Sequence, residues 1–284
     1  MVPLPTSFAR GEDESSSARI ILSVAKRWGG GPPSDSSVVE GPWRKLQPLC
    51  PRPICAAMGY ETDLKLFIDG VWKSADAGHS VVKPVDAQPI ADVPYATQAD
   101  LDEALAASER AWPEWRSTDV EKRGAILHKT AALLRERVDL IARTMTQEQG
   151  KPLGEAKLEV LGSAQLFDWY AEDAKRDYGR TLVRPAGQLS RVIRQPVGPV
   201  ATFTPWNFPI YLLAKKVSAA LAAGCTVISR PPHETPGCCT ELFRALADAG
   251  IPAGVAQLVH GDSASWVITV LATSTVCSRS QITR

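Results

Sequence analysis

The stretch Val200-Ala201-Thr202-Phe203-Thr204-Pro205-Trp206-Asn207-Phe208-Pro209 carries the clearest indication of the fold. Residues 199–203 are mostly apolar and β-forming, which predicts a buried strand. Residues 209–223 are apolar and small, which predicts a helix that ends at Gly224. A strand that passes directly into a helix is typical of a parallel α/β unit.

The residues that follow repeat this alternation. A buried strand, a helix with Pro236 in its first turn and a third strand are predicted at 225–229, 235–249 and 255–259. Strands and helices that alternate through short connections form right-handed parallel units. The sequence therefore predicts the α/β class, as a Rossmann-like parallel sheet with flanking helices. This fold class alone does not establish that a nucleotide binds.

The residues upstream predict a hairpin and a group of helices. Apolar β-forming residues surround an Asp69-Gly70 turn, which is typical of a hairpin. Further short extended segments are predicted at 81–84 and 90–94. Four helices are predicted, with Thr97 or Asp100 capping the first, which reaches Trp112, and with the others starting at about 119, 138 and 153. Another strand is predicted at 192–194.

Residues 1–57 differ from the rest in composition. They contain clustered serines, a Gly29-Gly30-Gly31-Pro32-Pro33 run and further prolines, which break helical and strand periodicity. We expect a disordered extension there, with Met58 as the natural start and one partial domain in 58–284. The acidic run Glu12-Asp13-Glu14 argues against a transit peptide.

Composition excludes several classes of protein. A net charge of +1 predicts neither nucleic acid nor an anionic membrane as a partner. No apolar run approaches the roughly 18 residues of a membrane span. The 6 cysteines form no C-x-x-C pair, so we expect reduced thiols in a cytoplasmic protein and no metal site. Cys238 and Cys239 lie near His233, but adjacent cysteines on a helix point in different directions.

Asn207 is the candidate catalytic residue. It follows the carboxyl end of a predicted parallel strand, where ligands of open α/β sheets bind. Its side-chain amide can donate to a carbonyl oxygen that is becoming an oxyanion. The alternative is that Asn207 only caps the helix that begins at Pro209.

The surrounding motifs strongly resemble the aldehyde dehydrogenase superfamily. The resemblance covers about residues 64–272, and the segments 169–172 and 194–198 look most similar to the succinate-semialdehyde dehydrogenase branch. Gly150-Lys151 lacks the other residues of a P-loop and is not interpreted as one. The motifs that carry the resemblance are Glu148-Gln149-Gly150-Lys151-Pro152-Leu153, Pro196-Val197-Gly198-Pro199-Val200, Thr204-Pro205-Trp206-Asn207-Phe208-Pro209, Ala220-Leu221-Ala222-Ala223-Gly224-Cys225, Glu234-Thr235-Pro236 and Ala249-Gly250-Ile251-Pro252.

This resemblance implies a cofactor, NAD or NADP, and an aldehyde as substrate. Asn207 matches the oxyanion-stabilising Asn of the family, and Thr204, Pro205 and Trp206 match the strand end along the cofactor. Two residues depart from the family pattern: Arg230 replaces a Lys that bonds the adenosine ribose, and His233 replaces a Glu. Arg suits phosphate, and losing the carboxylate removes a repulsion, so we expect tolerance of NADP. The alternative is that Arg230 and His233 are solvated surface residues.

The family's nucleophilic Cys and its general-base Glu lie in motifs that do not occur in this chain. We interpret Cys225 as core packing, and Cys277 has no feature that would lower its pKa. Residues 277–284 also replace an expected apolar strand. We therefore expect a sheet that is incomplete at the carboxyl end, an absent catalytic domain and no turnover by this chain.

Two other classes of function remain open. The chain could be a catalytically silent nucleotide-binding or interaction fragment. A short-chain dehydrogenase would need an early Gly-x-Gly-x-x-Gly, which is not present. The family resemblance also implies a homo-oligomer, which we expect only for an intact member.

Overall fold

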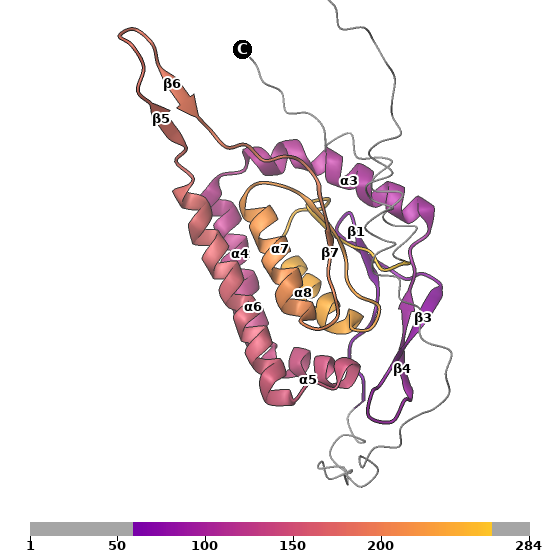
Figure 1. The fold of residues 1–284 in the computed structure, drawn as a ribbon. Helices are drawn as coiled ribbons and strands as arrows, with labels where there is room; N and C mark the ends of the chain where they lie inside the picture. The colour runs from indigo at the N-terminus through magenta and orange to yellow at the C-terminus, as the bar shows by residue number, and fades with distance from the viewer. Residues whose placement is uncertain (1–58, 263–284) are drawn as a thin grey trace, which may run out of the picture. The chain divides into compact units, whose positions relative to one another are not determined.

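Strands and helices alternate along the chain from Val200 to Leu258. The computed structural model describes residues 59–262, and Figure 1 shows the arrangement of its elements. β7 runs parallel to β8, and β8 runs parallel to β9, with Phe203 opposite Arg230. The α/β class and the predicted strand–helix order are confirmed. These elements are β7 (Val200–Phe203), α7 (Pro209–Ala222), β8 (Val227–Arg230), α8 (Pro236–Ala249) and β9 (Ala256–Leu258).

The predicted amino-terminal hairpin belongs to the same sheet. β1 (Leu66–Ile68) pairs antiparallel with both β2 (Val71–Lys73) and β9, which gives the order β2-β1-β9-β8-β7. All three residues of β1 are buried, because the strand lies between β2 and β9 and helices cover both faces of the sheet there. The sheet is therefore mixed, and β7 forms one of its ends.

The expectations for residues 1–57 and for 277–284 lie outside the described residues. Within 59–262, no strand pairs with the outer side of β7.

Two further hairpins lie apart from this sheet. β3 (Ala77–Val82) pairs with β4 (Pro89–Pro94), as the predicted extended segments indicated. β5 (Arg180–Leu182) pairs with β6 (Ser190–Val192), and this hairpin projects from the end of the helices in Figure 1. The strand predicted at 192–194 thus ends at Val192 and pairs locally instead of joining β7.

In the described part of the chain, the helices that precede β7 are α3 (Gln98–Ser117), α4 (Val120–Glu136), α5 (Val138–Gln149) and α6 (Leu153–Asp173), followed by a short 3₁₀ turn, η2 (Ala174–Arg176). Thr97 and Asp100 form a reciprocal capping box at the start of α3. α3 continues beyond the predicted end at Trp112, through Pro113. This extension buries Trp115, which is 1% exposed, and burial of a large aromatic side chain outweighs the cost of the proline.

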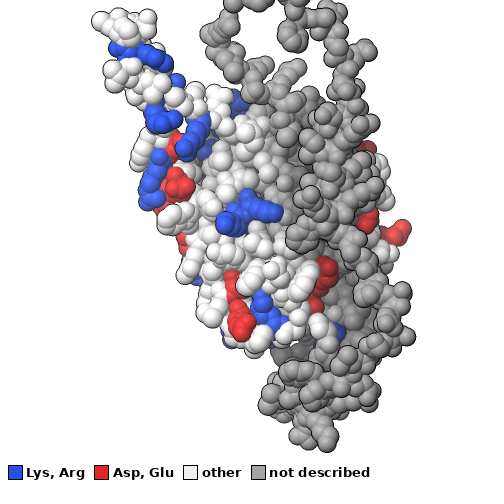
Figure 2. Space-filling model, in the orientation of Figure 1, with Lys and Arg blue, Asp and Glu red and all other residues white. Residues whose placement is uncertain are grey.

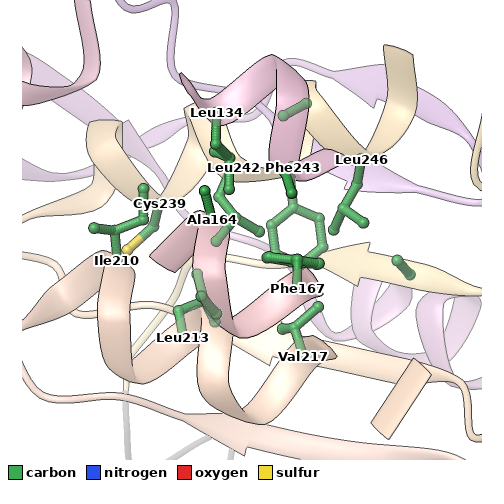
Figure 3. Packing of buried hydrophobic residues seen from close by; sticks show 14 of the residues in the cluster. Leu134, Ala164, Phe167, Ile210, Leu213, Val217, Cys239, Leu242, Phe243 and Leu246 are labelled. Atoms are coloured by element: carbon green, nitrogen blue, oxygen red, sulfur yellow. The ribbon is translucent and has the colours of Figure 1, made fainter. Parts of the chain in front are cut away.

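The two faces of the sheet are covered by different helices. Leu66 and Ile68 pack with Leu101 of α3, whereas Phe67 packs with the cluster formed by α7 and α8. This alternation is the period of two expected of a strand buried on both faces. α4 and α6 form a further layer against α7 and α8. Figure 3 shows Phe167 of α6 between Val217 of α7 and Phe243 of α8.

Candidate functional site

The carboxyl ends of β7, β8 and β9 meet at one edge of the sheet. Phe203 lies opposite Arg230, and Ser229 lies opposite Leu258, so Thr204 and His260 follow the two strands that flank β8. This register brings Thr204–Asn207, Arg230–His233 and His260 to the same edge. Ligands of open α/β sheets bind at such an edge.

The segment after β7 is exposed at its tip and buried at its base. Pro205, Trp206, Asn207 and Phe208 are exposed, whereas Thr204 is buried. The Thr204 hydroxyl has no hydrogen-bond partner among the described residues. A buried hydroxyl without a partner at a ligand-binding edge fits a polar ligand that supplies one.

Side chains from the end of α5 hold the backbone of this segment. The Gln149 side-chain amide donates to the carbonyls of Trp206 and Asn207 at 2.8 and 2.9 Å. Lys151 Nζ donates to the Asn207 carbonyl at 3.0 Å and also binds the buried Glu159 carboxylate. Sequence reasoning missed these contacts, although both residues lie in the motif that carried the family resemblance.

The capping alternative for Asn207 is wrong in this structure. Phe208 is the N-cap residue of α7, and the carboxylate of Glu159 accepts from the backbone N–H of Tyr211 in the first turn at 3.3 Å. Between residues 59 and 262, the Asn207 side-chain amide makes no hydrogen bond, while its carbonyl is held by Gln149 and Lys151. The amide is therefore available to a ligand on a fixed backbone.

Arg230 is not the solvated residue of the alternative interpretation. It is 8% exposed, its Nε donates to the Gly261 carbonyl at 3.1 Å, and burial lowers its pKa. One of its terminal nitrogens lies 3.4 Å from His233 Nδ1. His233 is partly exposed and its ring meets that of His79 edge to face at 4.6 Å. The sequence pattern gave no reason to bring His79 to this place.

His260 lies buried behind Arg230. Both of its ring nitrogens lack partners in the described part of the chain. Burial, reinforced by the charge of Arg230, lowers its pKa to about 3, so the ring is neutral at physiological pH.

Thr235 occupies the predicted N-cap position of α8 but does not cap it with its side chain. Glu148 of α5 takes this role, since its carboxylate accepts from the backbone N–H groups of Gly237 and Cys238 at 2.6 and 3.3 Å. A carboxylate suits the positive end of a helix better than a hydroxyl does. Tyr60 adds a hydrogen bond to the same carboxylate at 2.8 Å. Burial nevertheless raises the pKa of Glu148 to about 7.

An open apolar groove lies beside Asn207. It has a volume of about 490 Å³ and lies between α6 and the start of α7. Such a lining suits the carbon chain of a small molecule. The residues that line it are Glu155, Leu158, Glu159, Gly162, Phe208, Tyr211 and Leu212.

A second groove, of about 690 Å³, is lined by cations such as Arg116, Arg123 and Arg176 at the base of the β5–β6 hairpin. Figure 2 shows Lys and Arg gathered along that hairpin and at its base. None of the predicted site residues lines this groove.

None of the cysteines among the described residues is an exposed candidate nucleophile at this edge of the sheet. Cys225, Cys238 and Cys239 are buried in the structure, and Cys225 packs at the start of β8 as expected. Cys277 lies outside the described residues. Within 59–262 there is no group of three or more His, Cys, Asp or Glu side chains arranged to hold a metal ion. No helix in this part of the chain is long and apolar enough to cross a membrane.

The donors at the edge fit the ribose and phosphate groups of a dinucleotide. Among the described residues, the Arg230 guanidinium forms hydrogen bonds with a backbone carbonyl and a histidine, and the buried hydroxyls of Thr204 and Thr235 have no partners. The fold and this edge define a Rossmann-like α/β protein whose polar side chains gather at the carboxyl ends of its parallel strands. Comparison with known proteins then identifies the family.

The sequence model of the aldehyde dehydrogenase family matches residues 72–277, and the chain belongs to this family of oxidoreductases. Glutarate-semialdehyde dehydrogenase of Pseudomonas putida is 41% identical over 202 residues, which are 69% of this chain and 42% of that protein. Succinate-semialdehyde dehydrogenase (NADP+) of Escherichia coli is 39% identical over 202 residues, with the same coverage of 69% and 42%. The resemblance to the succinate-semialdehyde dehydrogenase branch is thus confirmed among the relatives.

A crystal structure of an aldehyde dehydrogenase from Brucella melitensis biovar abortus has the same fold, with a TM-score of 0.73 and 42% identity. The match covers 76% of this chain and 45% of that one. The chain spans less than half the length of the relatives named here.

Proposed function

We propose that this chain supplies the cofactor-binding part, within residues 58–284, of an NAD(P)-dependent enzyme that oxidises an aldehyde to a carboxylic acid. The observation that carries the proposal is the fixed Asn207 backbone with a free side-chain amide, at the edge where Arg230 also lies. The names of the relatives favour a semialdehyde, such as succinic semialdehyde, as the substrate.

The proposed roles follow from where each side chain stands. The Asn207 amide donates to the aldehyde oxygen as that oxygen gains negative charge, and Gln149 and Lys151 fix the direction of this donor. The apolar groove beside Asn207 takes the carbon chain of the aldehyde. The cofactor, when bound, accepts a hydride. Thr204, Pro205 and Trp206 would lie along it, while Arg230 and His233 would contact its adenosine ribose.

We further propose that NADP is accepted at least as well as NAD. No carboxylate occupies position 233 to repel a 2′-phosphate, and the buried Arg230 guanidinium suits a phosphate oxygen. The name of the Escherichia coli relative also contains NADP.

Isothermal titration calorimetry of the full 284-residue chain with NAD and NADP tests the proposed binding. We expect both to bind, and Arg230→Met to weaken NADP by about tenfold or more, as expected for loss of a charge-assisted contact. Arg191→Met, at an exposed position on β6, is the matched control and leaves both affinities unchanged. A clear preference for NAD would contradict the proposed NADP tolerance, and absence of any binding would contradict the function.

Turnover is the second measurement. Succinic semialdehyde and either cofactor are added to the chain, and reduced nicotinamide is followed by absorbance. We expect binding without turnover, because the cysteines of the described part are buried and the family's Cys and Glu motifs do not occur in the sequence. Turnover that survives Cys225→Ala would contradict the proposed absence of a nucleophile.

A further inference from the structure

Three side chains that can carry positive charge meet beside the end of β8. His233 Nδ1 lies 3.4 Å from a terminal nitrogen of Arg230, and the His233 and His79 rings are 4.6 Å apart, edge to face. Arg230 is the last residue of β8 and His233 follows it closely, whereas His79 belongs to β3. We call this group the 79–230–233 cluster.

The acidic groups around the cluster are few and exposed. Glu234 Oε1 lies 3.6 Å from His233 Nε2, and the Glu234 side chain is 45% exposed. Tyr95, Glu234 and Asp262 are near enough to Arg230 to act on it electrostatically. Among the ion pairs of the described residues, none joins Arg230 to a carboxylate within 4.0 Å. Within residues 59–262 the guanidinium therefore has no carboxylate close enough to form an ion pair.

The environment of His79 favours the neutral form of its imidazole in the free protein. Burial lowers the pKa of His79, and the neighbouring His233 lowers it further, while Glu234 opposes both. His260, behind Arg230, is neutral and contributes no charge. Protonation of the pair would add a positive charge next to Arg230, which is unfavourable unless an anion is present.

We propose that the 79–230–233 cluster binds a phosphomonoester dianion, and that the His79–His233 pair takes up a proton as the anion binds. The inference rests on the proposed function, because the phosphomonoester that we assign is the 2′-phosphate of NADP. It adds His79, from the β3–β4 hairpin, to the residues that separate NADP from NAD.

The proposal predicts the direction in which the affinity for NADP changes with pH. If binding raises the proton affinity of the pair, the affinity for NADP increases as the pH falls from about 8 to about 6.5. We expect the Kd to fall by about threefold to tenfold over this interval, which corresponds to uptake of up to one proton. The second pKa of a phosphomonoester is about 6, so the gain stops near that pH. NAD lacks the phosphate, and its Kd stays constant.

The experiment uses calorimetry of the full chain with NADP and NAD at both pH values. Each titration is made in two buffers of different ionisation enthalpy, which gives the number of protons taken up. The variants are His79→Gln and His233→Gln, which keep polar side chains but cannot titrate. The matched control is His128→Gln, on α4, where His128 contacts only Asp168 and Glu172 among the described interactions.

A second measurement separates the cluster from cofactor binding. The chain contains 4 histidines, so their imidazole signals are resolved in an NMR pH titration. Inorganic phosphate and 2′-AMP are added as separate probes. We expect 2′-AMP to raise the titration midpoints of His79 and His233, with a smaller effect of free phosphate, and none on His128 or His260.

The outcomes are distinct. Proton uptake with NADP that is lost in both cluster variants supports the proposal. NADP binding with the same pH dependence in native and variant chains overturns it and leaves the proposed function intact. If neither dinucleotide binds, the proposed function fails, and the NMR result decides the cluster: raised midpoints with either phosphate probe support an anion site, and unchanged midpoints overturn it.

Discussion

Lys151 Nζ donates to the backbone carbonyl of Asn207 at 3.0 Å, across 56 residues of sequence. The same ammonium group binds the Glu159 carboxylate and lies 4.2 Å from the centre of the Phe208 ring. Lys151 and Glu159 have side-chain exposures of only 10% and 3%. A buried ion pair thus fixes the backbone that carries the candidate oxyanion donor.

Removal of the lysine charge is expected to destabilise the chain strongly. Lys151→Met leaves the Glu159 carboxylate buried without its cation, which costs about 3 kcal/mol. The double variant Lys151→Met, Glu159→Gln recovers much of this loss, because no uncompensated charge remains. Urea unfolding measures the free energy of unfolding of the single and of the double variant. Lys157→Met, which breaks an exposed pair with Asp139, costs less than about 1 kcal/mol as a control. Equal losses of stability in Lys151→Met and Lys157→Met would contradict the interpretation that Lys151 and Glu159 form a buried ion pair.

Gln149→Ala is expected to loosen the segment after β7 without unfolding the protein. It removes the two side-chain donors to the carbonyls of Trp206 and Asn207, each worth about 1 kcal/mol. Hydrogen exchange followed by mass spectrometry should therefore show faster exchange in 204–209 and an unchanged rate in α6. Gln165→Ala, at an exposed position of α6, should leave both regions unchanged. Unchanged exchange in the Gln149 variant would show that Lys151 alone holds the segment.

The stability of the chain should fall as the pH rises through the range in which Glu148 titrates. Burial raises its pKa to about 7 from an ordinary value of 4.5, so the folded chain binds more protons than the unfolded chain between these values. The contribution is fully present below about pH 4.5 and is lost as the pH passes about 7, with a size on the order of 3 kcal/mol. Glu148→Gln removes this slope, whereas Glu155→Gln, on the exposed start of α6, retains it. The free energy of unfolding across this pH range measures the difference, and identical slopes in native and Glu148→Gln chains would refute the assignment.

Gly237 is required by the close approach of α5 and Tyr60 to the start of α8. A Cβ atom there would lie 2.0 Å from Tyr60 Oη and 2.8 Å from Glu148 Oε1. Gly237→Ala should therefore destabilise the chain by about 1–3 kcal/mol, because rigid partners have to move. Gly154→Ala is the control: a Cβ atom there meets nothing within 4 Å, and alanine favours the helix. Thermal unfolding should show a lower Tm for the first variant only.

The alternation of β7, α7, β8, α8 and β9 was predictable because each element carries its own local signal. Apolar β-forming runs, Pro236 and Gly250 mark where strands and helices begin and end. The insertion of β1 beside β9 was not predictable, because Phe67 and Leu258 are 191 residues apart and neither carries a pairing signal. α3 also ran past its predicted end, since the burial of Trp115 is a tertiary effect.

The candidate site was predictable only where local sequence signals place its residues at the ends of strands. Asn207 and Arg230 follow strand ends, so the parallel topology alone brings them together. Gln149, Lys151 and His79 reach the site through packing of α5 and of the β3–β4 hairpin, which the sequence pattern does not specify. Glu148 as the cap of α8 is a further example, since the local pattern pointed to Thr235.

β7 ends the sheet, and within residues 59–262 the outward backbone N–H and C=O groups of β7 have no partner strand. An open edge of this kind is a template onto which another polypeptide can add a strand. The segment that carries the candidate oxyanion donor continues directly from this edge. A strand paired with this edge would therefore lie beside the backbone that leads to Asn207.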